Sequence, residues 1–368
     1  MSASNPIPIG GRRRADQLLA GFAEGDAISH EAIRLRNTLR TLGYDSDIFV
    51  DPRHITPAIR SSCQSLLDYR GRADDLCLYH YGISSPATDV FRGAPGRRIL
   101  IYHNITPARF FKGYDDHMVR LLTDGRSELG ELAPACNAAW AVSAYNAREL
   151  RDAGFRNVEV FPLLFSPDSL ALEPDPGVTG QFAAKLFTIL YVGRLSPNKR
   201  VEDLIQAFAW FHRSLNPFSR LVIVGSPRTA PRYFSMLRML VGDLDLPNVC
   251  FEGFASPAGL VAYYRAADIY VSTSEHEGFC LPLLEAMHMG LPVIARSIGG
   301  VPEALSGAGV QYDDLSHIEL AGLIHKVATR PDLRAEIMES QKARIRDVMA
   351  RDVQAELQGL LARLILRS

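Results

Sequence analysis

Short apolar runs alternate with segments of helical spacing along the whole chain, and this repeating order constrains the fold more than any other feature of the sequence. In the first half, the runs at 76–79, 99–102 and 138–142 have the length and composition of buried strands, and residues 29–42 have helical periodicity. Strand, turn and helix in repeated order favour parallel sheets with helices on both faces. The sequence therefore predicts an α/β fold.

The same order starts again in the second half, with a strand predicted at 187–192 and a helix at 201–211. A length of 368 residues suits two domains of roughly 150–200 residues each. We therefore expect two doubly wound, Rossmann-like units facing each other across a cleft. The expected boundaries are an N-terminal domain at 1–164, a Pro- and Gly-rich linker at 165–185, a second domain at 186–350 and a C-terminal helix at 351–368. Whether that last helix returns to the N-terminal domain stays open.

Charge and cysteine usage exclude several classes of protein. The chain has 40 Lys and Arg against 41 Asp and Glu, so the basic excess of a nucleic-acid-binding protein is missing. The five cysteines are odd in number and lack C-x-x-C spacing, which argues against a disulfide framework and a zinc site. Residues 1–10 lack a signal-peptide core, and no uncharged apolar run reaches about 18 residues. We expect a cytoplasmic protein, with the basic run at 12–14 either solvated or in contact with a membrane surface.

The segment at 274–293, S-E-H-E-G-F-C-L-P-L-L-E-A-M-H-M-G-L-P-V, is the most informative for chemistry. Pro282 fits the first position of a helix and Gly290 fits just past its end, so a short helix is predicted at 282–289. Gly278 allows a ligand to approach the backbone closely, and a helix N-terminus suits a phosphate. Glu277 in the loop and Glu285 one turn inside the helix would border the two ends of one ligand.

This segment resembles the Glu-x7-Glu signature of retaining GT-B glycosyltransferases of group 1, the family 4 class. The usual form is E-G-F-G-L-P-x-x-E-A-M-A-x-G-x-P-V, and the chain departs from it at Cys280, where Gly is common, and at His288, where a small residue is common. The resemblance implies that Glu285 binds the ribose hydroxyls and that Glu277 binds hydroxyls of the donor sugar. It also implies that backbone N–H groups help to bind the donor diphosphate; these belong to Phe279, Cys280 and Leu281.

A second segment, Y-V-G-R-L-S-P-N-K-R-V-E-D-L-I-Q-A at 191–207, resembles the G-R-x-x-x-x-K-G stretch of the same family. There the Arg and Lys hold the donor diphosphate, roles that would fall to Arg194 and Lys199. Breaking a sugar–phosphate bond leaves growing negative charge on the diphosphate, which two nearby cations stabilise. Arg200 stands where the family usually has Gly.

Further positions agree with the resemblance. Gly225 ends a strand, Phe254 lies in the loop that contacts the base in the family, and Gly25 lies in a glycine loop that lacks the usual second glycine. In the wider class a histidine at the end of an N-domain strand lies close to the donor sugar, with His103 as the first candidate and His80 as the second. The candidate catalytic residues are Glu277, His103, Arg194 and Lys199. Residues 106–124 are expected to form either an acceptor loop or an interdomain contact.

The resemblance implies retaining transfer of a hexose or deoxyhexose from a nucleoside diphosphate sugar to a saccharide or lipid-linked saccharide acceptor. Similarity to bacterial mannosyl- and rhamnosyltransferases favours a GDP-linked donor first and a UDP-linked donor second. Neither a cofactor nor a metal is expected, because the two cations take the metal's place. A lipid-linked acceptor would bring the protein to the inner face of the membrane.

Three other functions share this architecture. A dehydrogenase would need G-x-G-x-x-G after a strand, which is missing. A sugar-nucleotide epimerase of the same fold does not usually carry this Glu-x7-Glu context. A non-catalytic copy would have lost Arg194, Lys199 or Glu285, and all three are present.

Overall fold

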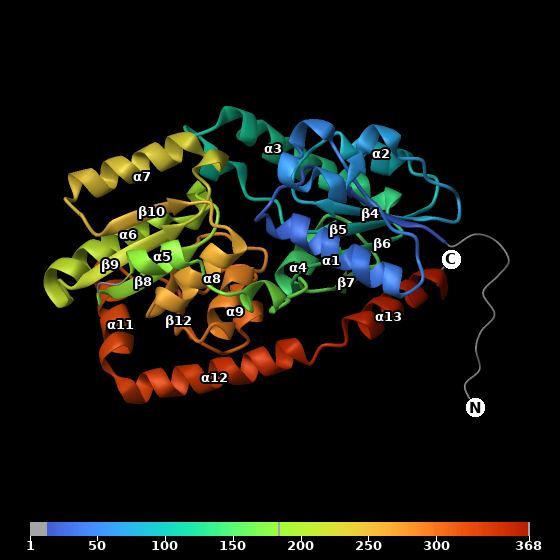
Figure 1. The fold of residues 1–368 in the computed structure, drawn as a ribbon. Helices are drawn as coiled ribbons and strands as arrows, with labels where there is room; N and C mark the ends of the chain where they lie inside the picture. Colours follow the sequence, from blue (N-terminus) through green and yellow to red (C-terminus); the bar gives the residue numbers. More distant parts are fainter. Residues whose placement is uncertain (1–12, 183–184, 367–368) are drawn as a thin grey trace, which may run out of the picture.

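Two parallel β-sheets, one in each half of the chain, form the framework of the computed structural model (Figure 1). The structure describes residues 13–182 and 185–366. The expectations for residues 1–10 and for Arg12 lie outside the described residues. Both sheets carry helices between successive strands, which confirms the α/β fold with two sheet-containing units.

The first sheet has seven parallel strands in the order β3-β2-β1-β4-β5-β6-β7. The order reverses between β1 and β4, and such a switch point is where ligands bind in doubly wound sheets. Its strands are β1 Ala15–Leu19, β2 Ile48–Val50, β3 Gln64–Ser65, β4 Leu76–Tyr81, β5 Arg97–Tyr102, β6 Ala138–Ala141 and β7 Val158–Val160. Its helices are α1 Ala27–Thr41, α2 Ala87–Gly93, α3 Asp116–Leu132 and α4 Ala144–Asp152.

The second sheet has six parallel strands in the order β10-β9-β8-β11-β12-β13, with its switch point between β8 and β11. Its strands are β8 Phe187–Val192, β9 Ser219–Val224, β10 Val249–Gly253, β11 Ile269–Ser272, β12 Val293–Arg296 and β13 Val310–Tyr312. The helices of this half are α5 Pro176–Gln181, α6 Val201–Trp210, α7 Pro231–Asp243, α8 Pro257–Ala266, α9 Leu281–His288, α10 Val301–Leu305 and α11 His317–Thr329.

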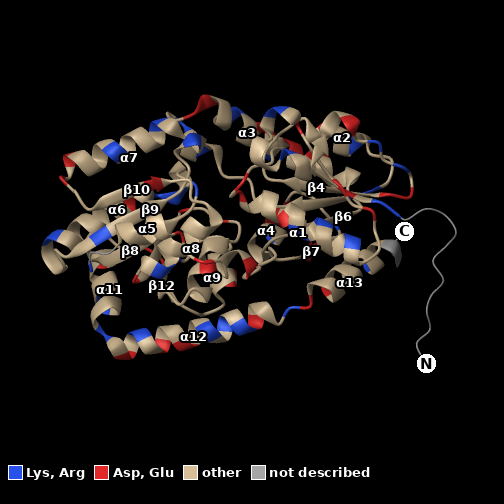
Figure 2. Ribbon diagram, in the orientation of Figure 1, with Lys and Arg blue, Asp and Glu red and all other residues tan. Residues whose placement is uncertain are grey.

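The last two helices connect the two units again. Helix α12 (Pro331–Met349) runs along the second unit, and α13 (Val353–Leu366) reaches the first (Figure 1). Leu357, Leu360 and Leu361 of α13 are buried in one cluster with Leu78 and Trp140 of the first sheet. Basic and acidic side chains alternate along α12 (Figure 2), as on a solvated helix face. No helix in the described part of the chain is long and apolar enough to cross a bilayer.

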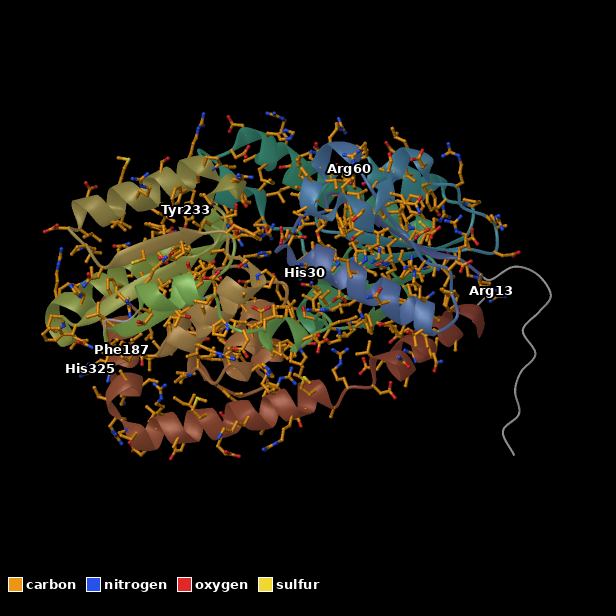
Figure 3. All side chains as sticks on the ribbon, viewed as in Figure 1. Arg13, His30, Arg60, Phe187, Tyr233 and His325 are labelled. Atoms are coloured by element: carbon orange, nitrogen blue, oxygen red, sulfur yellow. The ribbon has the colours of Figure 1, made fainter. Side chains whose placement is uncertain are left out.

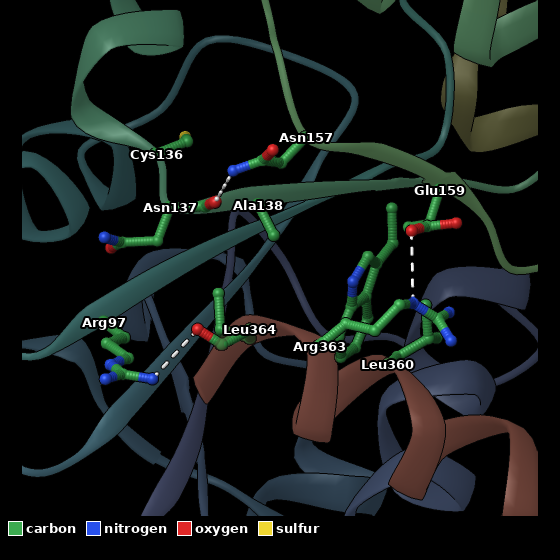
Figure 4. A pocket seen from close by; sticks show the side chains of 10 residues that line it. Arg97, Cys136, Asn137, Ala138, Asn157, Glu159, Leu360, Arg363 and Leu364 are labelled. Carbon is green, nitrogen blue, oxygen red and sulfur yellow. Dashed lines mark hydrogen bonds and ion pairs between the residues drawn. The ribbon is translucent and has the colours of Figure 1, made fainter. Parts of the chain in front are cut away.

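A cavity of about 220 Å³ lies between α13 and the first sheet (Figure 4). It is lined by residues that begin strands, Arg97 of β5 and Ala138 of β6, together with Leu360 and Arg363 of α13. Arg363 is ion-paired to Glu159 at 3.2 Å. The cavity therefore lies at the amino ends of the strands, at the edge of the sheet opposite the switch-point loops.

Several element boundaries differ from the sequence expectations. Helix α1 begins at Ala27, two residues before the predicted helical segment, because Asp26 caps it, accepting from the Ser29 N–H at 3.0 Å. Residues 165–185 contain a helix, α5, whose Asp175 cap and Pro176 start are ordinary helix-start signals. Strand β1 was not expected, because Asp16 and Gln17 interrupt its apolar run.

Candidate functional site

The carboxyl ends of the two sheets meet, and the candidate residues lie where they meet. An added Cβ at Gly278, in the loop after β11, would lie 2.7 Å from the His103 carbonyl oxygen, just after β5, and 3.1 Å from the Asn104 Cβ. An added Cβ at Gly25, in the loop between β1 and α1, would lie 2.5 Å from the Phe254 ring, just after β10. Gly278 needs glycine because the backbone of the opposite domain lies against it, and Gly25 needs glycine because its φ of 72° is left-handed.

The loops at the two switch points supply most of the candidates. Arg194 and Lys199 follow β8, and Glu277 follows β11, so they come from the two strands between which the order of the second sheet reverses. In the first sheet, Gly25 follows β1 and His80 lies in β4. This arrangement matches the rule that open α/β sheets bind ligands at the carboxyl ends of switch-point strands.

Lys199 and Glu277 form the central charged pair of the site. The Lys199 Nζ lies 2.6 Å from Glu277 Oε1, and their side chains are only 13% and 8% exposed. Burial works to raise the pKa of Glu277, but the charge and hydrogen bond of Lys199, with a hydrogen bond from Ser274, hold the pKa below its usual value. Glu277 is therefore an anion at neutral pH, fixed next to a cation.

Arg194 differs from Lys199 in its surroundings. Arg194 is exposed, and its guanidinium forms no hydrogen bond or ion pair with any residue in 13–182 or 185–366. Its carbonyl accepts from the Tyr191 hydroxyl at 3.3 Å, which holds the backbone of the turn. A free guanidinium at this position is able to bind two oxygens of an anion at once.

Cys280 and Arg200, which stand where the family usually has glycine, both fall on left-handed backbone. Cys280, just before α9, has φ 75°, and Arg200, just before α6, has φ 50°. Glycine adopts these conformations without steric cost, which explains the family preference for it. The Arg200 side chain is held by Asp203 at 2.9 Å and Glu202 at 3.0 Å, which offsets part of the strain.

Replacing Cys280 tests this strain directly. We expect Cys280→Gly to be more stable than Cys280→Ala by about 1 kcal/mol, because both lose the thiol but only alanine keeps the left-handed cost. At an ordinary position alanine is the more stable of the two residues. Urea unfolding of both variants measures the difference, and a Cys280→Ala protein that is the more stable of the two would contradict the strain.

Glu285 lies in α9 and is held from the same domain. The Tyr264 hydroxyl donates to its Oε2 at 2.9 Å. Burial raises the pKa of Glu285, while the Tyr264 hydrogen bond and then the charge of Arg34 on α1 oppose that rise.

Gly225, just after β9, packs directly on the Gly193 carbonyl, and its N–H donates to the Gly253 carbonyl at 2.8 Å. Gly225 therefore holds together the turns that carry Arg194 and Phe254.

His103 and His80 are in direct contact. The His80 Nδ1 and the His103 Nε2 lie 2.8 Å apart, and the two ring planes are within 15° of parallel, as suits a hydrogen bond between ring edges. Burial lowers the pKa of His103 to about 4, although Asp26 opposes the shift, and burial also lowers the pKa of His80 well below its usual value. His103 is half-buried and keeps part of its surface accessible, whereas His80 is only 3% exposed.

The segment at 106–124 forms an interdomain contact, one of the two alternatives expected for it. The Phe110 ring lies 6.3 Å from His276 in the loop before Glu277, and Tyr114 packs edge-on against Tyr233 of α7 at 5.5 Å. Tyr233, labelled in Figure 3, is fully buried and donates its hydroxyl to Glu202. These aromatic contacts join the first unit to α7 and to the loop that carries Glu277.

Sequence reasoning missed residues that hold the site rather than line it. Tyr264 orients Glu285, Ser274 hydrogen-bonds Glu277, and Gln17 hydrogen-bonds His80. A polar residue inside an otherwise apolar strand, as Gln17 is, was the signal that could have found one of them. Among the residues described, no group of three or more His, Cys, Asp or Glu side chains is arranged to hold a metal ion.

Known proteins are similar to this chain in part of its sequence and in its fold. A family model described as glycosyl transferases group 1 matches residues 180–344. The D-inositol 3-phosphate glycosyltransferase of Acidothermus cellulolyticus is 35% identical over 165 residues, 42% of this chain and 36% of that protein. The GDP-mannose-dependent alpha-mannosyltransferase of Mycolicibacterium smegmatis is 30% identical over 182 residues, 48% of this chain and 44% of that protein. The matches thus span less than half the length of these curated relatives.

A solved structure extends the likeness to the whole fold. The Anabaena protein HepE, in complex with UDP and glucose, superposes with a TM-score of 0.71 at 18% identity, covering 95% of this chain and 100% of that one. The family model covers the loops that carry Arg194, Lys199, Glu277 and Glu285. Residues 180–344 therefore match the group 1 glycosyl transferases, and the chain as a whole has the two-domain GT-B fold.

Proposed function

We propose that the protein is a retaining glycosyltransferase that moves a hexose or deoxyhexose from a nucleoside diphosphate sugar to a saccharide or lipid-linked saccharide acceptor. The observation that carries this proposal is the buried Lys199–Glu277 pair. The exposed Arg194 lies in the same loop as Lys199, and Gly278, the residue after Glu277, packs on the His103 carbonyl of the other domain. These charged groups supply cations for a diphosphate and an anion for the sugar in one place.

The chemistry follows from these charges. Arg194 and Lys199 stabilise the negative charge that grows on the departing diphosphate, with help from the N–H groups at the start of α9. Glu277, ionised at neutral pH, accepts hydrogen bonds from sugar hydroxyls and stabilises positive charge at the anomeric carbon. The acceptor hydroxyl attacks from the face that the diphosphate leaves, and a phosphate oxygen takes its proton. We propose that no metal is needed, because the two cations supply the positive charge.

The nucleotide lies, in this proposal, between Glu285, which binds the ribose hydroxyls, and Phe254, which borders the base. Phe254 is 51% exposed, so its ring is accessible to a base. A GDP-linked sugar is our first choice of donor and a UDP-linked sugar the second; the relatives named above include a GDP-mannose-dependent enzyme and a protein that binds UDP and glucose. A lipid-linked acceptor would bring the protein to a membrane surface.

Thermal unfolding with GDP, UDP, ADP, dTDP and NAD, with EDTA present, tests the proposal. We expect one nucleoside diphosphate to raise the unfolding temperature, because a ligand at about 100 times its Kd stabilises the folded state by about 2.7 kcal/mol. Glu285→Ala should lose most of that rise while unfolding normally without ligand.

Each other outcome has a distinct meaning. Stabilisation by NAD alone would favour a dehydrogenase. A response that appears only after divalent metal replaces EDTA would contradict metal independence. Equal stabilisation of Glu285→Ala and the unaltered protein would remove Glu285 from the ribose.

A further inference from the structure

A chain of buried hydrogen bonds runs from α1 through two strands to His103. The Gln17 Nε2 donates to the Ala32 carbonyl at 3.0 Å, and the Gln17 Oε1 lies 2.7 Å from the His80 Nε2. The His80 Nδ1 lies in turn 2.8 Å from the His103 Nε2. Gln17 is fully buried in β1 and His80 is nearly so in β4, so water does not compete for these bonds.

The direction of every bond follows from the first. A backbone carbonyl only accepts, so the Gln17 amide nitrogen must face Ala32 and its oxygen must face His80. That oxygen also only accepts, so the His80 Nε2 carries the proton and its Nδ1 accepts. The His103 Nε2 must then donate, which leaves the proton off its Nδ1. Within the described residues, no hydrogen-bond partner is present at that Nδ1.

Burial keeps both rings neutral, which this direction of bonding requires. It lowers the pKa of His103 to about 4 and also lowers that of His80 well below its usual value. The charged group that acts on His103 from α1 is Asp26, which also caps that helix. In the opposite domain, Gly278 packs on the His103 carbonyl, and the charge of the adjacent Glu277 is paired with Lys199.

We infer that Gln17 and His80 are positioning residues that hold His103 as the tautomer with an accepting Nδ1. A ligand atom that meets this nitrogen must therefore be a hydrogen-bond donor, such as a sugar hydroxyl, and not a phosphate oxygen. This step rests on the proposed function, since the hydroxyl belongs to the donor or acceptor sugar. The fixed tautomer itself exists with or without substrate.

Nitrogen-15 NMR of labelled histidine tests the tautomer without any ligand, since protonated and unprotonated ring nitrogens differ in chemical shift. We expect the His103 Nδ1 to be unprotonated at neutral pH, with the signal assigned by its loss in His103→Gln. In Gln17→Met, His80 loses its acceptor, so a proton should appear on the His103 Nδ1 in part of the molecules. Gln341→Met is the matched control, because Gln341 is also fully buried and hydrogen-bonds Val293 and Leu291.

Variants of His80 test the same chain of hydrogen bonds without altering Gln17. A folding defect in Gln17→Met therefore does not affect this second test. Glutamine at 80 is able to accept from His103 and donate to Gln17, whereas leucine is not. We therefore expect His80→Gln to keep the tautomer and most of the turnover, and His80→Leu to mix the tautomers and lower kcat/KM roughly tenfold, the order for one hydrogen bond.

The outcomes separate this inference from the proposed function. A protonated Nδ1 in the unaltered protein overturns the inference, and so does an unchanged tautomer in both Gln17→Met and His80→Leu. A protein with the expected tautomer but no transfer from any nucleotide sugar would overturn only the proposed function. Gln341→Met is expected to lower stability without changing the His103 tautomer. The same result in Gln17→Met would mean that Gln17 has only a structural role.

Discussion

Lys199→Ala should lower turnover by about 100-fold and the free energy of unfolding by about 3 kcal/mol at neutral pH. The loss of rate follows from removing one of two cations that stabilise the leaving diphosphate. The loss of stability follows because Glu277, 8% exposed, would remain buried as an unpaired anion. Steady-state kinetics with the nucleotide sugar and urea unfolding at pH 7.5 measure the two effects.

Arg194→Ala is the matched control, because Arg194 is exposed and has no ion pair among the described residues. We expect it to lower turnover about as much, with a change in unfolding free energy below about 0.5 kcal/mol. An undiminished rate in Lys199→Ala would remove that residue from the site, and unchanged stability would show that the pair does not support the fold.

The pH dependence of this stability difference has a definite sign. In the unaltered protein the pKa of Glu277 lies below the ordinary value of 4.5, so the pair stabilises the fold above that pH and loses this contribution as pH falls through the lowered pKa. Without Lys199, burial prevails and raises the pKa of Glu277, so the variant loses stability as pH rises. The difference between the two proteins should therefore shrink at pH 4.

Gly278→Ala should lower kcat/KM by about 100-fold while each domain stays folded. The new methyl group would lie 2.7 Å from the His103 carbonyl oxygen, so either the loop or the domain interface must move. A displacement of about 1 Å between the two halves of a site costs roughly that factor in rate. Small-angle X-ray scattering should show a less compact molecule if the interface opens.

Gly322→Ala, in α11, provides the control. No atom lies within 4 Å of an added Cβ at Gly322, and alanine is favoured inside a helix. It should keep the full rate and gain up to about 1 kcal/mol of stability. A normal rate in Gly278→Ala would mean that the catalytic arrangement of the domains is more open than this one.

Local signals in the sequence predicted the elements that depend on local interactions. Helix α9 begins one residue before the predicted start, with Pro282 in its first turn and Gly290 just past its end. Strand β8 was predicted with its observed bounds, because an apolar run of strand length is typical of a buried parallel strand. Helix α5 was missed although the Asp175–Pro176 start signal was present, since the surrounding Pro and Gly suggested a linker.

Long-range interactions account for what the sequence did not predict. Strand β1 contains Gln17, which a buried strand does not tolerate unless partners elsewhere satisfy it. Those partners are Ala32 and His80, and His80 lies 63 residues away. The left-handed backbone of Cys280 was likewise not evident, although the usual glycine at that position was the clue.

The sequence by itself determined the α/β order, the two-unit plan and the chemical groups of the site. Only the tertiary structure decided which groups pair: Lys199 with Glu277, 78 residues apart, and His103 with His80. The reason is physical. Parallel strands bring their carboxyl ends to one edge whatever their separation in sequence, so the pattern predicts which loops converge. Pairing, pKa and tautomer depend on distances of a few ångströms, which only the packed domains fix.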